Sequence, residues 1–248
     1  MIILKSRAEI EKMRVACRIV AGALAGLKEV VRPGVTTAEL DSFAEGYIVK
    51  HGGIPAFKGY MGYPSTLCAS INEVVVHGIP SARRLNEGDI IGLDLGAVVD
   101  GYYGDAAITL PVGEISDQLK KLLDVTERCL YAGIENAIVG NRVSDISNAV
   151  QTLAEANGFS VVREFVGHGV GRRLHEDPQV PNFGPPGQGP RLKAGTTLAI
   201  EPMVNMGASQ TVVLEDKWTA VTFDRRPSAH FEHTVAVTDK GPEILTAL

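Results

Sequence analysis

The first fifty residues carry two apolar stripes at helical spacing. The first stripe runs at alternating intervals of three and four residues, the period of a helix packed on one side: Ile10, Met13, Cys17, Val20, Leu24, Leu27 and Val31. Pro33-Gly34 ends it. A capping-box pattern at Thr36-Thr37-Ala38-Glu39 then precedes a second stripe at Leu40, Phe43 and Tyr47. These patterns predict a helix pair ahead of the first strand.

Runs of β-branched residues bounded by Gly and Pro predict the strands that follow. They lie near Ile71–Val76, Asp89–Val99 and Asp105–Leu110. The second half repeats this order, with helical patterns at Asp117–Ala137 and Ser144–Ala156 and strands from Thr197 onward.

The repeat is also visible residue by residue. Leu85–Asp94 matches Leu192–Glu201 at an offset of 107, and Gly34–Leu40 matches Gly140–Ile146 at an offset of 106. Either match alone is weak, but both agree with the order of the elements. We therefore expect an α+β fold in one domain, residues 1–248, made of two related halves of about 1–112 and 113–248.

Composition excludes several classes of protein. Hydrophobic residues make up 45% of the 248 residues, as in ordinary globular proteins, and the net charge of -5 gives no general attraction to nucleic acid or anionic membranes. Neither a signal peptide nor an apolar run of membrane-spanning length is present, which predicts a cytoplasmic protein. The three cysteines, Cys17, Cys68 and Cys129, are widely spaced and are expected to be reduced.

The segment GLDLGAVVDGYYGD, residues 92–105, reads as a β-hairpin that carries acids. Asp100-Gly101 is a type I′ turn signal, which would pair Val99 with Tyr102 and place Gly96 opposite Asp105. In this register Asp94 and Asp105 are diagonal neighbours on one face, roughly 7 Å apart.

Two ionised carboxylates so close together repel each other unless a divalent cation lies between them. The alternative is that Asp94 bonds a backbone amide and Asp105 only ends a loop. Glu201, at the repeat position equivalent to Asp94, favours the metal interpretation. Glu232 and a neutral His168 would complete a set of four negative charges, which balances two divalent ions.

The sequence resembles the type I bacterial methionine aminopeptidases along essentially its whole length. The most specific matches are SINEVVVHGIP (70–80), DGYYGDAA (100–107), GHGVGRRLHEDPQVPN (167–182), AIEPMV (199–204) and FEHT (231–234). The resemblance implies the pseudo-two-fold pita-bread fold, a curved antiparallel sheet with two helix pairs on its outer face. It also implies two divalent ions (Co, Mn, Fe or Zn) held by Asp94, Asp105, His168, Glu201 and Glu232, and a Na or K ion near Asn72, Val74 and Ser228.

The function that the resemblance implies is removal of the initiator methionine from nascent polypeptides with a small second residue. A metal-activated hydroxide would attack the scissile bond. Glu201 would move the proton, His175 would contact the carbonyl and His77 the scissile amide. Tyr60, Tyr63, Cys68 and Trp218 match positions around the methionine side chain. A monomer with transient ribosome contact and no membrane or sequence-specific nucleic-acid partner is expected.

Alternatives remain open for several of these residues. The three pocket aromatics could be packing residues and His77 could cap a strand end, while His51, His230 and His233 are assigned to structure or surface. Three positions depart from the common family pattern: Met61, Leu174 and Ala106. The first two are expected to reshape the pocket, and Ala106 to remove a hydroxyl beside the metals.

Two other functions fit the same fold. An X-Pro aminopeptidase or prolidase usually carries an additional N-terminal domain, whereas this chain begins almost at the helix pair. A non-catalytic binding protein would have lost metal ligands, and all five ligand positions are intact here.

Overall fold

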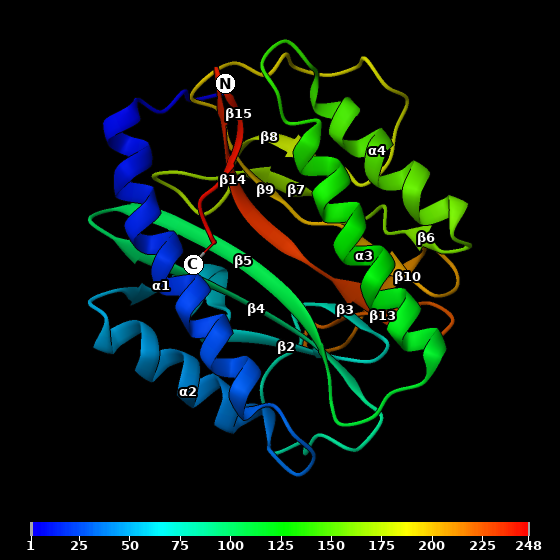
Figure 1. Cartoon of the computed structure of the whole chain (residues 1–248). Coiled ribbons are helices and arrows are strands. Elements are labelled where there is room, and N and C mark those ends of the chain that lie inside the picture. Colours follow the sequence, from blue (N-terminus) through cyan, green and yellow to red (C-terminus); the bar gives the residue numbers. More distant parts are fainter. Residues whose placement is uncertain (1, 248) are drawn as a thin grey trace.

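The computed structural model describes residues 2–247 and contains the four helices that the apolar stripes predict (Figure 1). They are α1 (Arg7–Val30), α2 (Thr37–Lys50), α3 (Asp117–Glu135) and α4 (Val143–Ala156). The predicted capping box of α2 is confirmed: Thr36 Oγ1 accepts the Glu39 N–H at 3.2 Å, and Glu39 Oε2 accepts the Thr36 N–H at 2.7 Å. Among the described residues, no helix combines the length and apolar character that crossing a membrane requires.

Within residues 2–247, fifteen strands and one 3-10 turn (Tyr60–Gly62) complete the secondary structure. The strands are β1 (Ile54–Pro55), β2 (Leu67–Ile71), β3 (Val74–Val76), β4 (Ile90–Val99), β5 (Tyr102–Pro111), β6 (Ser160–Val161), β7 (Gly167–Gly169), β8 (Glu176–Val180), β9 (Thr197–Ile200), β10 (Met203–Asn205), β11 (Thr211–Val213), β12 (Ala220–Thr222), β13 (Ser228–His230), β14 (Glu232–Thr238) and β15 (Gly241–Ile244).

A curved nine-stranded antiparallel sheet forms the centre of the molecule, and both helix pairs lie on one of its faces (Figure 1). Its main strand order is β1-β4-β5-β14-β9-β7-β8, with β2 on β4 and β15 on β14. This arrangement confirms the predicted fold class. Because β5 of the first half pairs with β14 of the second, the sheet is continuous across the two halves.

Helix α1 packs closely on the sheet because β5 carries a glycine beneath it. A Cβ added at Gly104 would lie 2.6 Å from the Cys17 nitrogen and 2.8 Å from its Cα. The apolar stripe of α1, including Val20, Leu24 and Leu27, is buried against Leu93 and its neighbours in the core. Each such buried side chain contributes about 1.5–3 kcal/mol of transfer free energy.

The prediction of one continuous strand over Ile71–Val76 is wrong. The chain turns at Asn72 and Glu73, where Asn72 adopts a φ of 53°, and this turn separates β2 from β3. Strand β2 pairs with β4 in the large sheet, whereas β3 pairs with β12 in a small three-stranded sheet. Ile71 and Val74–Val76 are β-branched, and the two polar residues between them gave no sign that the two ends of the run join different sheets.

Equivalent hydrogen bonds occur in the two halves at the offset of the sequence repeat. The Gly34 N–H donates to Leu85 O at 2.8 Å, and the Gly140 N–H donates to Leu192 O at 3.1 Å. Arg84 donates a guanidinium N–H to the Gly34 carbonyl, and Arg191 donates one to the Gly140 carbonyl. These contacts support, as a proposal, one domain of two related halves divided near residues 112 and 113.

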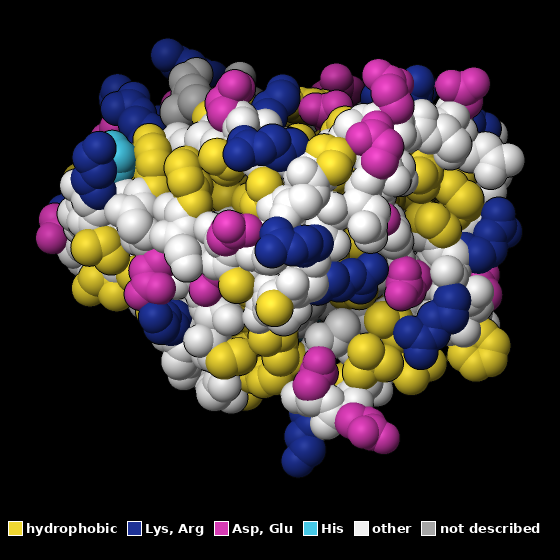
Figure 2. All heavy atoms as spheres, turned by 90° about the horizontal axis from the view of Figure 1, so that it is seen from below, with side chains coloured by type: hydrophobic (Ala, Val, Ile, Leu, Met, Phe, Trp, Pro, Cys, Tyr) yellow, Lys and Arg dark blue, Asp and Glu magenta, His cyan; other side chains and the backbone are white. Residues whose placement is uncertain are grey.

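Charged side chains of both signs are mixed on the face shown in Figure 2, with hydrophobic groups between them. The basic side chains on this face form no continuous field of the kind that nucleic-acid-binding surfaces carry.

Candidate metal centre and substrate cavity

The β4–β5 hairpin places Asp94 and Asp105 on one face of the sheet, in the register that its turn predicts. Asp100 and Gly101 have φ values of 50° and 74°, as a type I′ turn requires. Gly96 pairs with Asp105, and Asp94 pairs with Ala107, two residues further along β5. The two carboxylates are therefore diagonal neighbours.

The five predicted metal ligands come from five consecutive strands of the sheet. In strand order they are Asp94 on β4, Asp105 on β5, Glu232 on β14, Glu201 just past the end of β9, and His168 on β7. Glu232 lies opposite Ala107, the residue that also faces Asp94, and His168 lies opposite Ala199. Residues two apart in a strand share a face, so the pleat directs all five side chains to the same side.

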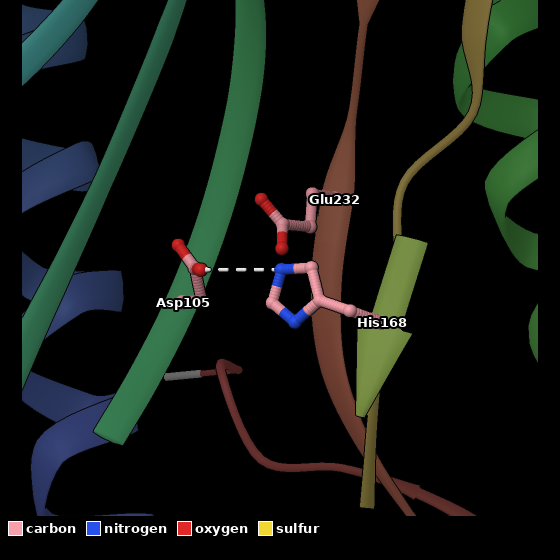
Figure 3. A group of neighbouring side chains, drawn as sticks. All are labelled: Asp105, His168 and Glu232. Atoms are coloured by element: carbon pink, nitrogen blue, oxygen red, sulfur yellow. Dashed lines mark ion pairs between the residues drawn. The ribbon is translucent and has the colours of Figure 1, made fainter. Parts of the chain in front are cut away.

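The polar atoms of this cluster approach one another at the centre of the sheet. Figure 3 shows Asp105, His168 and Glu232 pointing toward a common point, and their potential ligand atoms lie within 4.8 Å of one another. His168 Nε2 is 3.8 Å from Asp105 Oδ2 and 3.5 Å from Glu201 Oε1. Asp94 belongs to the same cluster, because the negative charges of Asp105 and Glu201 help to raise the pKa of its carboxyl group.

Burial and mutual repulsion disfavour ionisation of the carboxyl groups. Burial, with repulsion from neighbouring carboxylates, raises the pKa of Asp94, Asp105 and Glu232 well above the usual range. Burial also raises the pKa of Glu201 to about 8. A bound divalent cation would offset the repulsion and allow all four groups to ionise.

The imidazole of His168 is held in its neutral form. Burial, with a smaller effect from His175, lowers the pKa of its imidazole to about 3. Its Nδ1 lies 2.9 Å from the Gly169 carbonyl oxygen, which assigns the proton to that nitrogen. The Nε2 lone pair therefore faces the carboxylates, as in a histidine that binds a metal through Nε2.

The donor set fits divalent cations. Asp94 Oδ1, Asp105 Oδ1 and Glu232 Oε1 are buried without a hydrogen-bond partner among the described residues. Unpartnered buried carboxylate oxygens are costly, and metal coordination removes that cost. Several oxygens with one imidazole suit Mn, Fe, Co or Zn.

A cavity of about 210 Å³ opens beside the metal ligands. All residues predicted to act on or bind the substrate line it together with the five ligands: Tyr60, Tyr63, Cys68, His77, His175 and Trp218. Phe57, Met61 and Leu174 also line it. This volume is below the range of drug-sized ligand pockets, which is consistent with a site for one amino-acid side chain.

The two cavity histidines are neutral but differently exposed. Burial lowers the pKa of His77 to about 4; His175 is more exposed to solvent, and its partial burial at the cavity also lowers its pKa. His175 Nδ1 lies 2.7 Å from the Tyr60 hydroxyl, and its ring centroid is 4.2 Å from that of His168. The His77 ring packs edge-on against Trp218 and Phe165 instead, so packing as well as the cavity orients it.

Aromatic and sulfur groups form the apolar wall. The Tyr63 ring lies edge-on to Trp218 at 5.1 Å, and its hydroxyl is 3.0 Å from the carbonyl oxygens of Leu67 and Gly78. Burial raises the pKa of Cys68 well above its usual range, so its thiol is neutral. Tyr63 therefore both packs and lines the cavity.

The three departures from the family pattern have different outcomes. Leu174 is buried in the cavity wall, and Met61 is 83% exposed at its rim. Ala106 pairs with Leu95 and His233 and belongs to the core beneath the helices. Its side chain lies on the opposite face from the carboxylates, so the expectation that it changes the surroundings of the metals directly is wrong.

His230 is the residue that the sequence analysis missed. It is 4% exposed, and its Nε2 lies 3.5 Å from Glu201 Oε2 without a hydrogen-bond partner. The sequence signal for its place in the site was its position two residues before Glu232, because that spacing puts two side chains on the same side of an extended chain. The structural assignments of His51, at the C-cap of α2, and of His233, bonded to Thr246, agree with the structure.

The residues predicted to hold a monovalent cation lie together at the β3–β13 contact. The Ser228 N–H donates to the Asn72 carbonyl at 2.9 Å, and Val74, two residues after Asn72, begins β3. The Asn72 side chain bonds Asp89 and the Ile90 N–H. The cation itself stays a prediction.

Comparison with known proteins gives consistent matches along the chain. Metallopeptidase family M24 matches residues 11–239. The sequence is 55% identical to the methionine aminopeptidase of Clostridium perfringens over 100% of both chains, and 56% identical to methionine aminopeptidase 1 of Bacillus subtilis over 99% of both. The structure matches the methionine aminopeptidase of Thermotoga maritima with a TM-score of 0.99 at 48% identity over 100% of both chains.

A prolidase from Pyrococcus furiosus shares the fold more distantly. Its TM-score is 0.80 at 23% identity, and this chain covers 66% of its length. That likeness extends to the fold alone.

Proposed function

The chain belongs to metallopeptidase family M24, as a homologue of the methionine aminopeptidases, and from this premise we propose that it removes the initiator methionine from polypeptides whose second residue is small. The observation that carries the proposal is the convergence of the five predicted metal ligands, from five adjacent strands, beside a cavity of about 210 Å³. The alternative X-Pro activity is less well supported, because the prolidase likeness is confined to the fold.

Two divalent ions are proposed in this site, held by Asp94, Asp105, His168, Glu201 and Glu232. When bound, such ions lower the pKa of water and polarise a carbonyl group. The protein would contribute four carboxyl groups and one imidazole from neighbouring strands whose relative positions the sheet register fixes.

Glu201 is proposed to move the proton. One of its oxygens faces His168 Nε2 and the other faces His230 Nε2, each at 3.5 Å. A carboxylate at the edge of the cavity can accept a proton from water and deliver it to the leaving amine. Without metal the pKa of Glu201 is about 8, so bound cations would be needed to keep it ionised at neutral pH.

His77 and His175 are proposed to bind the reacting peptide unit. Both are neutral above their lowered pKa values, so each can donate one N–H without bringing a positive charge into the site. Tyr60 orients His175 through its hydroxyl. Tyr63, Cys68 and Trp218 would surround the methionine thioether, for which aromatic and sulfur contacts are favourable.

The decisive assay compares Met-Ala-Ser with X-Pro peptides, each with and without chelator. We expect release of methionine from Met-Ala-Ser only, with loss of activity in chelator and recovery on adding Mn, Fe, Co or Zn. Cleavage that is insensitive to chelator, or a preference for X-Pro peptides, would contradict the proposal.

The partners follow from this substrate. Nascent polypeptides are made in the cytoplasm, where we propose that the protein acts, and transient ribosome contact and a monomeric state stay predictions. A Na or K ion near Asn72, Val74 and Ser228 is likewise proposed, from the resemblance and from their proximity.

A further inference from the structure

A buried ion pair lies outside the cavity and joins two distant parts of the chain. Lys5 precedes α1, and its side chain is 4% exposed; Glu176 begins β8, and its side chain is 1% exposed. Lys5 Nζ contacts Glu176 Oε2 and donates to the Ile3 carbonyl at 2.9 Å. Charged side chains are rarely buried to this degree, so the pair is retained against a desolvation cost.

The second oxygen of Glu176 shapes the preceding turn. Oε1 accepts the backbone N–H groups of Arg172 at 2.8 Å and Arg173 at 3.1 Å. The carboxylate therefore closes residues 172–176 into a loop, while Lys5 neutralises its charge from the other side.

This loop carries two residues of the cavity wall. Leu174 and His175 lie in the sequence between Arg173, whose N–H Glu176 accepts, and Glu176 itself. Both side chains line the cavity. Besides its ring contact with His168, the His175 side chain has one hydrogen-bonded side-chain partner among the described residues, the Tyr60 hydroxyl. The position of its imidazole thus depends on how the loop is held.

The contact between Lys5 and the loop has little freedom. A Cβ at Gly171 would overlap Lys5 Cε and would lie 2.7 Å from its Nζ and 2.9 Å from Glu176 Oε1. The Lys5 backbone is fixed as well, because its N–H donates to Gly195 O at 2.7 Å. Movement of Lys5 would therefore be transmitted to the loop.

We propose that Lys5, acting through Glu176, is a positioning residue that holds His175 at the substrate cavity, a role that rests on the proposed aminopeptidase function. The N-terminal segment would then contribute to turnover although Lys5 itself does not line the cavity.

The test is Lys5→Met in the metal-loaded enzyme. It removes the charge at similar length and leaves Glu176 free to move toward water. We expect kcat on Met-Ala-Ser to fall at least about tenfold with KM changed less than about threefold, because a small misplacement of a group used in the transition state lowers kcat. An unchanged kcat would overturn the proposal.

A further variant separates positioning from loss of stability. Leu27→Ala removes a fully buried side chain of α1 far along the helix and costs about 2–5 kcal/mol, comparable to breaking a buried ion pair. We expect its kcat per folded molecule to stay within about twofold of wild type. A loss equal to that of Lys5→Met would overturn the proposal.

A double-mutant cycle tests the route through His175. If Lys5 acts through this imidazole, Lys5→Met should have no further effect on kcat in a His175→Ala background. Additive losses would contradict the proposal. Should Lys5→Met not fold, Lys5→Met/Glu176→Gln replaces it, since the amide oxygen can still accept the Arg172 and Arg173 N–H groups. We expect that double variant to keep most of the wild-type kcat, and a double variant that folds but has lost kcat would count against the route.

A readout independent of activity separates this proposal from the proposed function. In metal-free protein at fixed pH, we expect the His175 Hε1 NMR signal to shift or broaden in Lys5→Met, while that of His51, at the far end of α2, stays unchanged. An unmoved His175 signal would overturn the positioning role. Failure of wild type to cleave Met-Ala-Ser would instead refute the aminopeptidase function.

Discussion

At the residue scale, the site is defined by polar atoms that the protein leaves unpaired. Asp94, Asp105 and Glu232 each keep one buried oxygen without a hydrogen-bond partner in residues 2–247. Serine, threonine or backbone donors could have satisfied these atoms, as Thr234 does for the backbone of Asp105. Such unpaired oxygens destabilise the metal-free protein, which supports the proposal that cations bind here.

Changing Asp94 to Asn tests this conclusion. We expect kcat/KM for Met-Ala-Ser to fall at least about 100-fold because a metal ligand is lost. The metal-free protein should unfold at the same or a higher temperature, since one of several repelling carboxyl groups is removed.

Asp100→Asn is the matched control. Asp100 is the turn residue of the same hairpin with a φ of 50°, and Asn is well suited to that conformation. Its activity should remain within about twofold of wild type. Full activity in Asp94→Asn would reject the ligand role of Asp94.

At the element scale, local patterns were reliable where one short-range signal decided the structure. The three-and-four stripe from Ile10 to Val31 predicted α1, and the Asp100-Gly101 turn predicted the register of β4 and β5. The single strand predicted near Ile71–Val76 was wrong because Ile71 pairs with β4 whereas Val74 and Val76 pair with β12 in another sheet, and no short-range signal records which distant strand each end meets.

Replacing Gly104 or Gly46 with Ala should change the free energy of unfolding in opposite directions, because Gly104 lies against α1 whereas Gly46 has open space around it. Gly104→Ala would place a methyl group against the backbone of Cys17 and should lower the free energy of unfolding by about 1–3 kcal/mol or more. Gly46→Ala, on an exposed helical position of α2 with open space around it, should raise it by about 0.5–1 kcal/mol. Urea unfolding measures both, and a neutral Gly104→Ala would contradict the close approach of helix and strand.

At the scale of the whole molecule, the buried site should make stability depend on pH and metal. Glu201 has a folded-state pKa of about 8 against an ordinary 4.5, so its contribution is fully present below pH 4.5 and is lost as the pH rises through 8. His77 and His168, lowered to about 4 and 3, act in the opposite sense, but only below their ordinary value of 6.5. Between pH 6.5 and 8 the carboxyl effect therefore dominates.

We expect the free energy of unfolding of metal-free protein to fall by about 2 kcal/mol over that interval from Glu201 alone. Saturating divalent metal should raise stability and remove most of this dependence, because it binds the ionised ligands of the folded state. Urea titrations in chelator and in metal at several pH values measure this. A metal-free protein that grows more stable from pH 6.5 to 8 would contradict the buried cluster.

The sequence by itself determined the helices, the hairpin register, the repeat and, through the resemblance, the residues that line the site. These features follow from periodicity, turn chemistry and ordered motifs, each of which depends on residues that are close together in the sequence. Only the tertiary structure decided that Asn72 divides a strand, that Ala106 faces the helices, that His230 approaches Glu201 and that Lys5 pairs with Glu176. Those outcomes depend on which distant segments meet when the core closes, and contacts between residues such as Lys5 and Glu176 leave no periodic signal in the chain.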